Sequence, residues 1–250
     1  MHIIHAIFLG ILQGLTEFFP VSSSAHLELF SKIFSLTSFD PFFYLSLHLG
    51  TVCSSIIFFR HDIKNLLFHN RKELLYYILA LLPLFPIYFL AGSFIKSIPF
   101  NGIHLMITGV LLLIAILIPF EKKPYISPIR KSLDVLFIGL MQALALIPGF
   151  SRSGLTISSA KIRGWPKEKA IRFSFMLAIP TIMGGSALEL LKLNKDTIAK
   201  MDITSLTIGF LVSFAVGMMG INGIFIIAKR GKMKFIAIYC ILAGLIAYLI

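Results

Sequence analysis

Two short stretches of this chain place polar side chains inside otherwise apolar sequence, and the first begins at Gln13. Glu17 follows four residues later, so both side chains lie on one face if the segment is helical. A carboxylate and an amide placed in this way can hold a hard divalent cation through oxygen, or orient a base. An ionisable group in an apolar segment costs roughly 2.5 to 3.5 kcal/mol on insertion scales, which makes Glu17 a functional candidate. The alternative is a buried Glu17 that hydrogen-bonds between helices.

Hydroxyl groups and a histidine follow Glu17 directly. Ser22, Ser23 and Ser24 precede His26, and on a helix that begins near Ser22 one of the hydroxyls can lie beside the imidazole. A serine next to a histidine is the minimum of an activated nucleophile. The alternative is that the serines only cap a helix while His26 packs at an interface.

The second stretch, residues 148–156, places Arg152 among the hydroxyls of Ser151, Ser153 and Thr156. A guanidinium can bind two phosphate oxygens at once, and the free N–H groups at the start of a helix add further donors. This pattern predicts a site for a phosphate or a diphosphate. The alternative is an arginine whose charged end reaches the membrane surface.

Other polar residues predict less. Asp134, Glu189 and His104 lie near the ends of apolar segments, where we expect interfacial water to solvate them. His48 lies early in an apolar segment and is expected to be a packed, hydrogen-bonded histidine. Trp165 is expected near the headgroup region.

The composition identifies the class of protein that must position these groups. Of 250 residues, 57% are hydrophobic and 14% charged, whereas a soluble domain has about 25% charged residues. The chain is therefore neither an ordinary soluble domain nor a disordered one, and its apolar runs predict a polytopic helical membrane protein. Its net charge of +12 does not indicate a nucleic-acid partner, because the basic residues lie between apolar segments. Cys53 and Cys240 lie within apolar runs, so we expect neither a disulfide framework nor a metal cluster.

Eight apolar stretches divide the chain, and most approach the ~20 residues that cross a bilayer as a helix. They cover residues 3–19, 42–59, 74–92, 103–120, 135–150, 171–191, 206–228 and 235–250. The first and the fifth end in sequence rich in Pro, Gly and Ser, which interrupts helices. Free backbone at membrane depth is tolerated only where it packs in protein or lines a cavity. We therefore expect these two stretches to be re-entrant, which leaves six transmembrane helices.

The two re-entrant stretches resemble each other. At a constant offset of 129, the matching residues are Gly10 and Gly139, Gln13 and Gln142, Leu15 and Leu144, Ser22 and Ser151, and Ser24 and Ser153. Polar matches inside apolar sequence are less expected by chance than apolar ones. The pattern predicts two related halves, residues 1–120 and 121–250, within one integral membrane domain.

Lysine and arginine orient the two halves. Seventeen of the 23 basic residues lie in loops 60–73, 121–131, 161–172 and 229–234, which the positive-inside rule places in the cytoplasm. The first re-entrant segment then enters from outside and the second from the cytoplasmic side. Two similar halves of opposite topology form an inverted repeat, whose broken helices meet near the midplane. The predicted fold is an all-α integral membrane protein with an inverted-topology repeat, six transmembrane helices and two re-entrant helical segments.

Both motifs match a known family. Residues 13–26, Gln-Gly-Leu-Thr-Glu-Phe-Phe-Pro-Val-Ser-Ser-Ser-Ala-His, resemble the (Glu/Gln)-x-x-x-Glu region of undecaprenyl-diphosphate phosphatases of the bacitracin-resistance type. Residues 148–156, Pro-Gly-Phe-Ser-Arg-Ser-Gly-Leu-Thr, resemble the Pro-Gly-x-Ser-Arg-Ser-x-x-Thr motif of the same family. The motifs lie at the expected places in a chain of the expected length, so the resemblance covers essentially all of it.

The resemblance implies hydrolysis of undecaprenyl diphosphate to undecaprenyl phosphate and inorganic phosphate, which recycles the lipid carrier of cell-wall synthesis and confers bacitracin resistance. It implies an inverted repeat with two re-entrant helix pairs in the bacterial cytoplasmic (inner) membrane, with the site open to the outer side. It also implies a divalent cation, Mg²⁺ or Ca²⁺, held by Glu17 with Gln13. The implied partners are the bilayer and a polyprenyl diphosphate, and a homodimer is compatible. The implied site residues are Glu17, Ser22, Ser23, His26, Ser151, Arg152, Ser153 and Thr156.

Two questions stay open at this stage. The nucleophile is Ser23 with His26 as base, or a water molecule with His26 or Glu17 as base. The alternative function is a polyprenyl-phosphate transporter or flippase that uses the same headgroup site, since inverted repeats with broken helices are a transporter architecture. Lipid phosphatases of the phosphatidic-acid-phosphatase type need a histidine soon after a Ser-Arg pair, and no histidine follows His104.

Overall fold

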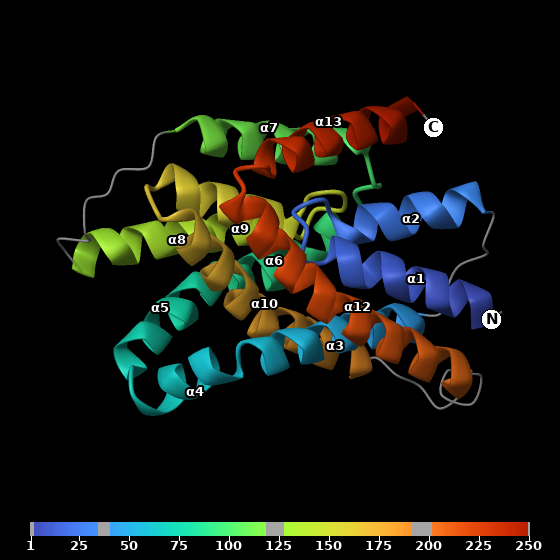
Figure 1. Ribbon diagram of the computed structural model, residues 1–250, viewed down its shortest axis with the longest axis horizontal. Coiled ribbons are helices and arrows are strands. Elements are labelled where there is room, and N and C mark those ends of the chain that lie inside the picture. Colours follow the sequence, from blue (N-terminus) through green and yellow to red (C-terminus); the bar gives the residue numbers. More distant parts are fainter. Residues whose placement is uncertain (1–2, 35–40, 119–127, 192–201, 250) are drawn as a thin grey trace.

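The computed structural model describes residues 3–34, 41–118, 128–191 and 202–249, and every regular element within these ranges is a helix (Figure 1). The helices are α1 (Ile3–Thr16), α2 (Ser23–Ile33), α3 (Pro41–Phe58), α4 (Arg60–Phe68), α5 (Arg71–Leu81), α6 (Leu84–Ser97), α7 (Gly102–Leu117), α8 (Pro128–Leu144), α9 (Arg152–Ile162), α10 (Lys167–Leu190), α12 (Ile203–Lys229) and α13 (Met233–Leu249). The all-α prediction is confirmed for the described part of the chain.

Several helices are long and apolar enough to cross a membrane. Three meet both criteria within the described ranges, namely Arg71–Ile95, α10 and α12, and α3 with α4 makes a fourth if this pair, bent by 70°, is one span. The apolar helices α7 and α13 have 16 and 17 residues, or about 24 to 26 Å at 1.5 Å per residue. That is short of a hydrocarbon core of ~30 Å. Length and composition therefore support a multi-pass membrane protein with three or four clear spans in the described ranges, and the six spans predicted stay a prediction.

The two predicted re-entrant segments are both broken helices. α1 ends at Thr16, and the chain reverses over a short non-helical stretch before α2 begins. In the same way, α8 ends at Leu144 and the chain reverses before α9 begins. These stretches, residues 17–22 and 145–151, are named the first and second breaks. Figure 1 shows α1 and α8 approaching the centre of the molecule from opposite ends. The breaks meet there, which brings the two polar motifs together.

The helices that leave the breaks begin in the same way. Ser22 Oγ accepts from the N–H of Ala25 at 3.3 Å, and Ser151 Oγ accepts from the N–H of Gly154 at 3.1 Å. In both places the capping hydroxyl also lies 3.3 Å from the hydroxyl two residues further on. An N-cap side chain satisfies a backbone donor that has no partner within its helix. The local structure therefore repeats at the offset of 129 seen in the sequence.

Small residues let the helices around the first break pack closely. α12 lies against both α1 and α3. A Cβ atom at Gly14 would lie 2.8 Å from Val216 Cβ, and one at Gly50 would lie 2.1 Å from Ser213 Oγ and 2.5 Å from the carbonyl oxygen of Phe210. In membranes, where the hydrophobic effect does not drive helices together, such close contact supplies much of the association energy.

One predicted environment is wrong. Asp134 is fully buried, whereas the sequence suggested a solvated position near a segment end. Its carboxylate accepts from Arg163 Nε at 2.5 Å and from Trp165 Nε1 at 3.3 Å. These contacts join α8 to the turn after α9 and compensate the buried charge. Trp165 is also buried in the core.

Replacing Gly50 with alanine tests the packing of α3 on α12. We expect Gly50→Ala to lower the thermal unfolding temperature, because overpacking a closed interface costs about 1 to 3 kcal/mol. Gly92→Ala is the control, since its new methyl group would lie 3.8 Å from the Tyr88 ring, an ordinary contact. The measurement is circular dichroism of detergent-purified protein on heating. Equal unfolding temperatures for the two variants would contradict the packing described.

Candidate active site

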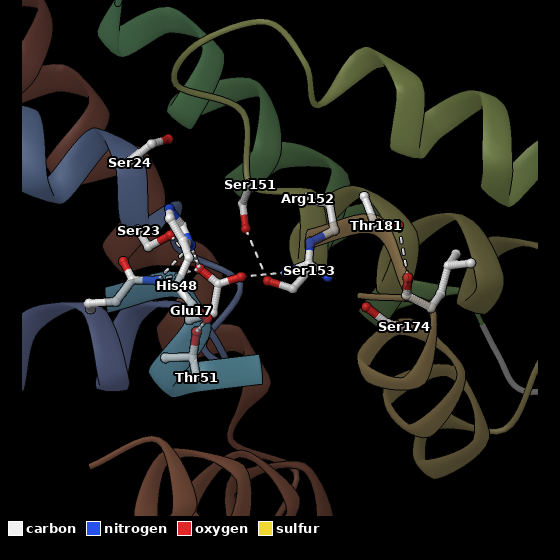
Figure 2. Close-up of polar contacts among 12 residues, drawn as sticks. Glu17, Ser23, Ser24, His48, Thr51, Ser151, Arg152, Ser153, Ser174 and Thr181 are labelled. Atoms are coloured by element: carbon white, nitrogen blue, oxygen red, sulfur yellow. Dashed lines mark hydrogen bonds and ion pairs between the residues drawn. The ribbon is translucent and has the colours of Figure 1, made fainter. Parts of the chain in front are cut away.

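A polar cavity of about 170 Å³ lies where the two breaks meet. The first break and its flanks, the second break and its flanks, α3 and α10 all contribute to its wall. The lining residues are Thr16, Glu17, Ser22, Ser23, Ser24, His48, Ala145, Phe150, Ser151, Arg152, Ser153 and Ile182. Figure 2 shows Glu17, Ser23 and His48 facing Ser151, Arg152 and Ser153 across it.

Glu17 is the centre of the hydrogen-bond network. Its Oε1 accepts from Arg152 Nη2, which joins positions 135 residues apart. Its Oε2 accepts from Gln13 Nε2 at 2.9 Å and from Ser23 Oγ at 2.7 Å. The Glu17 side chain is 7% exposed and that of Arg152 is 17% exposed. A buried carboxylate needs such compensation, because a charge taken out of water without a partner is strongly destabilising.

His48 belongs to this cavity, although the sequence suggested only a packed histidine. Its Nδ1 lies 2.9 Å from Gln13 Nε2 and 3.5 Å from Glu17 Oε2. The side chain is 31% exposed, so part of the ring faces the cavity. The available signal was the ionisable group itself, since such residues within membrane segments are functional candidates by default.

Two buried polar atoms in the cavity region have no hydrogen-bond partner among the described residues. They are Arg152 Nη1, a donor, and Gln13 Oε1, an acceptor. An unmatched buried polar group costs about 1 to 3 kcal/mol. Arg152 lines the cavity, so an anionic oxygen bound there would satisfy Nη1, whereas the fully buried Gln13 does not line it.

Two helix N-termini border the same cavity. The capping serines of α2 and α9, Ser22 and Ser151, both line it. The first N–H groups of a helix and its dipole favour an anion. Ser22 is also the single non-glycine residue with positive φ in the described ranges, at 65°. Strained backbone of this kind clusters at functional sites.

The structure does not bring His26 to Ser23. One ring nitrogen, Nδ1, lies 2.8 Å from the carbonyl oxygen of Ser22, and the other, Nε2, lies 2.7 Å from Tyr239 Oη. His26 is not among the residues that line the cavity. The hydroxyl of Ser23 donates to Glu17 instead. The predicted Ser–His pair is therefore replaced by a Ser–Glu pair, because the helical turn that begins at Ser22 directs the imidazole towards α13.

Of the other predicted site residues, Ser151 and Ser153 line the cavity, as predicted for substrate contacts, and Thr156 lies behind it in the contact between α9 and α10. Thr156 lies outside the cavity, one turn into α9, where its Oγ1 donates to the Arg152 carbonyl oxygen at 2.9 Å and pairs with Ser174 Oγ at 2.6 Å. Thr156 therefore joins α9 to α10 behind the cavity.

The donor set fits a divalent cation only together with a ligand. Within residues 3–34, 41–118, 128–191 and 202–249, no three His, Cys, Asp or Glu side chains gather as a metal site. Glu17 supplies the one carboxylate that the described residues place in the cavity wall and the predicted ligand Gln13 does not line the cavity, whereas Mg²⁺ and Ca²⁺ take about six or more oxygen ligands. Mg²⁺ commonly completes its shell with substrate phosphates and water. The cavity therefore suits a cation that arrives with a diphosphate.

An apolar groove lies beside the cavity, between α3 and α10. It has a volume of about 300 Å³, and its lining residues are Tyr44, Leu45, His48, Ile182, Gly185, Ser186 and Glu189. His48 and Ile182 line both spaces. A ligand with a charged head and an apolar chain could therefore occupy the two together.

The apolar helices and the two helix breaks with Arg152 between them define a class, that of multi-pass membrane proteins with a cavity lined by polar residues between two helix breaks. The comparisons with known proteins agree with this class. The family described as bacitracin resistance protein BacA matches residues 6–246, and this chain belongs to that family.

Its relatives resemble it over almost their whole length. The undecaprenyl-diphosphatase of Protochlamydia amoebophila is 37% identical, over 98% of this chain and 97% of the relative. The undecaprenyl-diphosphatase of Bacteroides thetaiotaomicron is 37% identical over 97% and 96%, respectively. That of Methanococcus vannielii is 38% identical over 96% of each chain.

A lysine at position 152 tests whether diphosphate binding needs the planar guanidinium group of Arg152. We expect Arg152→Lys to keep the positive charge and to weaken binding of inorganic diphosphate by about 10- to 100-fold, because a hydrogen bond to a charged group contributes about 1.5 to 3 kcal/mol. Calorimetric titration of the detergent-purified protein measures this. The control is Arg172→Lys, which changes a half-exposed arginine paired with Asp62 outside the cavity. An unchanged affinity for Arg152→Lys would exclude Arg152 as the diphosphate ligand.

Proposed function

We propose that this protein hydrolyses undecaprenyl diphosphate to undecaprenyl phosphate and inorganic phosphate, which recycles the lipid carrier of cell-wall synthesis. The observation that carries the proposal is the Glu17–Arg152 pair, which joins the two sequence motifs in one cavity. The printed name of the relatives, undecaprenyl-diphosphatase, supplies the substrate. Bacitracin resistance is the cellular property expected of such an enzyme.

Arg152 and the backbone donors at the two breaks bind the diphosphate. The free Nη1 of Arg152 is available for a phosphate oxygen, while Nη2 already contacts Glu17. As the terminal phosphoryl group transfers, charge develops on its oxygens and on the bridging oxygen. Donors already in place stabilise this charge without reorganising, which is the main contribution to catalysis of phosphoryl transfer.

The nucleophile is the Ser23 hydroxyl or a water molecule beside it, and Glu17 is the base in both cases. Ser23 Oγ already donates to Glu17 Oε2 at 2.7 Å, within the distance required for proton transfer. The nucleophile attacks the terminal phosphorus, its proton passes to Glu17, and the bond to the bridging oxygen breaks. Undecaprenyl phosphate then leaves. On the water route inorganic phosphate forms directly, and on the serine route a water molecule, with Glu17 again accepting the proton, hydrolyses the Ser23 phosphate and releases inorganic phosphate. A phosphorylated Ser23, trapped by acid quench, separates the serine route from the water route.

A divalent cation, Mg²⁺ or Ca²⁺, completes the proposed site. Glu17 would hold it, and when bound it neutralises the negative charge of the diphosphate. Glu17 is already oriented for this role, because Arg152, Gln13 and Ser23 fix both of its oxygens. The affinity for the cation alone is expected to be low, since most of its ligands come with the substrate.

The groove between α3 and α10 receives the first part of the lipid chain. Its wall is largely apolar, and it shares His48 and Ile182 with the cavity. The groove residues Tyr44 and Glu189 lie near the ends of α3 and α10 that lead into residues 35–40 and 192–201. The lysine distribution assigns these connections to the outer side. We therefore propose a site that opens outward in the bacterial cytoplasmic membrane.

The distribution of basic residues also supports an inverted repeat with six transmembrane helices and two re-entrant hairpins, α1–α2 and α8–α9. The repeated serine caps and the opposite approach of α1 and α8 favour it (Figure 1). In this topology α3 with α4, α5 with α6, α7, α10, α12 and α13 are the six spans. The short helices α7 and α13 would cross only where the bilayer is locally thin or the ends are hydrated.

Phosphate release from undecaprenyl diphosphate tests the function. We expect the purified protein to release phosphate, a chelator to abolish release, and both Glu17→Gln and Arg152→Ala to lower kcat by at least about 10²-fold, because each removes a charge that acts in the transition state. Glu28→Gln, at a half-exposed glutamate of α2 near Lys32, is the control and should remain active. A folded protein that binds the lipid without releasing phosphate would favour the transporter alternative.

Blocking the groove tests the placement of the chain. We expect Gly185→Phe to raise the KM for undecaprenyl diphosphate by about tenfold or more, because the new ring occupies space that the chain needs, and to affect farnesyl diphosphate less. No atom lies within 4 Å of a Cβ atom built at Gly185, so the new side chain begins in open space, and the unfolding temperature of the variant checks that the fold is kept. Ala187→Phe, on the same helix and outside the groove, is the control. Equal effects on both substrates would place the chain elsewhere.

A further inference from the structure

The two breaks leave backbone carbonyl groups that no helix satisfies. In a membrane such groups need a partner from the protein, since water is scarce. The carbonyl oxygen of Pro148 lies 2.6 Å from His104 Nδ1. A carbonyl can only accept, so Nδ1 carries the proton in this contact. The carbonyl oxygen of Pro20 in the first break accepts from Cys240 Sγ at 3.2 Å.

His104 lies on the face of α7 that packs against the second break. Its ring stacks on Phe150, with centroids 4.8 Å apart. One turn further along α7, Thr108 Oγ1 accepts from the N–H of Ser151 at 3.2 Å. Two hydrogen bonds and a ring contact therefore hold residues 148–151, which lead directly into Arg152.

Gly149 shows how closely this loop lies on α7. Its φ of +97° is in the left-handed region that favours glycine. A Cβ atom there would lie 3.1 Å from both the Asn101 carbonyl oxygen and His104 Cβ. The loop therefore rests on the first turn of α7 and has no space to shift towards it.

α13 holds the other hairpin in a similar manner. Besides the contact of Cys240 with the first break, Tyr239 Oη lies 2.7 Å from His26 Nε2 on α2, and their rings stack at 5.6 Å. α7 and α13 also pack directly on each other (Figure 1). A Cβ atom at Gly102 would lie 2.0 Å from the Gly244 carbonyl oxygen, so the two backbones touch.

We propose that α7 and α13 form a brace that sets the position of Arg152 relative to Glu17, and that His104 is a positioning residue within it. His104 contacts neither the cavity nor the reacting atoms. It acts through the Pro148 carbonyl and the loop that presents Arg152. The brace thus contributes to diphosphate binding and to alignment of the transition state.

α7 and α13 hold the two breaks with hydrogen-bond donors of different strength. The loop before Arg152 is held by an imidazole N–H, a strong donor, and by a threonine hydroxyl. The first break is held by a thiol, a weak donor. Loss of a donor at His104 should therefore disturb the site more than loss of the thiol at Cys240, although both lie on the same pair of helices.

The experiment compares three variants for affinity, turnover and unfolding temperature. His104→Phe keeps the ring that stacks on Phe150 and removes the donor, whereas the amide nitrogen of His104→Asn can replace Nδ1. His61→Phe changes an exposed histidine on α4 and is the control. Affinity is measured with inorganic diphosphate, and kcat and KM with undecaprenyl diphosphate. Turnover rests on the proposed function, but the affinity for inorganic diphosphate does not, so the two ideas can fail separately.

We expect His104→Phe to lower kcat/KM by about 10- to 100-fold, the effect of a small misplacement of a catalytic group. Diphosphate affinity should fall with it, while His104→Asn restores both and His61→Phe changes neither. In an Arg152→Lys background, His104→Phe should add little, because residues that act through one another are not additive.

Three results would overturn the proposal. The first is an unchanged diphosphate affinity in His104→Phe. The second is an equal loss in His104→Phe and His104→Asn, which would show that the donor is irrelevant. The third is a full additional loss in the Arg152→Lys background, which would show that His104 does not act through the arginine loop. A general loss of folding is detected by the unfolding temperature, and His104→Asn then decides the question.

Discussion

The ion pair between Glu17 and Arg152 joins residues 135 positions apart, and the remaining structure of the site follows from the need to bury it. Neither charge is tolerable alone at this depth, because removing a charge from water without compensation is strongly unfavourable. The pair can form only where both hairpins end at the same depth. Gln13, Ser23 and His48 then surround the carboxylate, while one arginine nitrogen is left without a partner. In the proposed function, that donor binds the diphosphate, so the pair serves both the structure and the substrate.

The two helix breaks leave backbone groups without partners in their own helices, and the fold satisfies them in two ways. Serine side chains cap the helices that begin at the breaks, with the same hydrogen-bond pattern in each half, although the backbone of Ser22 has a positive φ and that of Ser151 is extended. Side chains of α7 and α13 satisfy the prolyl carbonyls. Small residues allow α7 and α13, and likewise α12 and α3, to approach until their backbones touch. Close packing therefore has a functional consequence, since it limits the movement of the residues that face the cavity.

The shared wall of cavity and groove connects the chemistry of the site with the nature of its substrate. A diphosphate head needs donors and a cation, whereas a polyprenyl chain needs an apolar wall, and His48 and Ile182 lie where the two meet. The relatives named undecaprenyl-diphosphatase align over 96–98% of this chain. Their similarity includes every element that contributes to the cavity, so the whole architecture, and not a motif alone, supports the proposed reaction.

The sequence by itself determined the helical membrane class, the two broken segments, their likeness at an offset of 129, and the expectation that the two breaks meet. These follow from hydrophobicity, from proline and glycine, and from the expense of charge in apolar surroundings. Only the tertiary structure decided between His26 and His48. Both are histidines in apolar sequence, but each residue of a helix turns its side chain by about 100°, and packing sets which side faces the cavity. The same holds for Asp134 and His104, whose partners lie in the turn after α9 and in the second break and have no local signature.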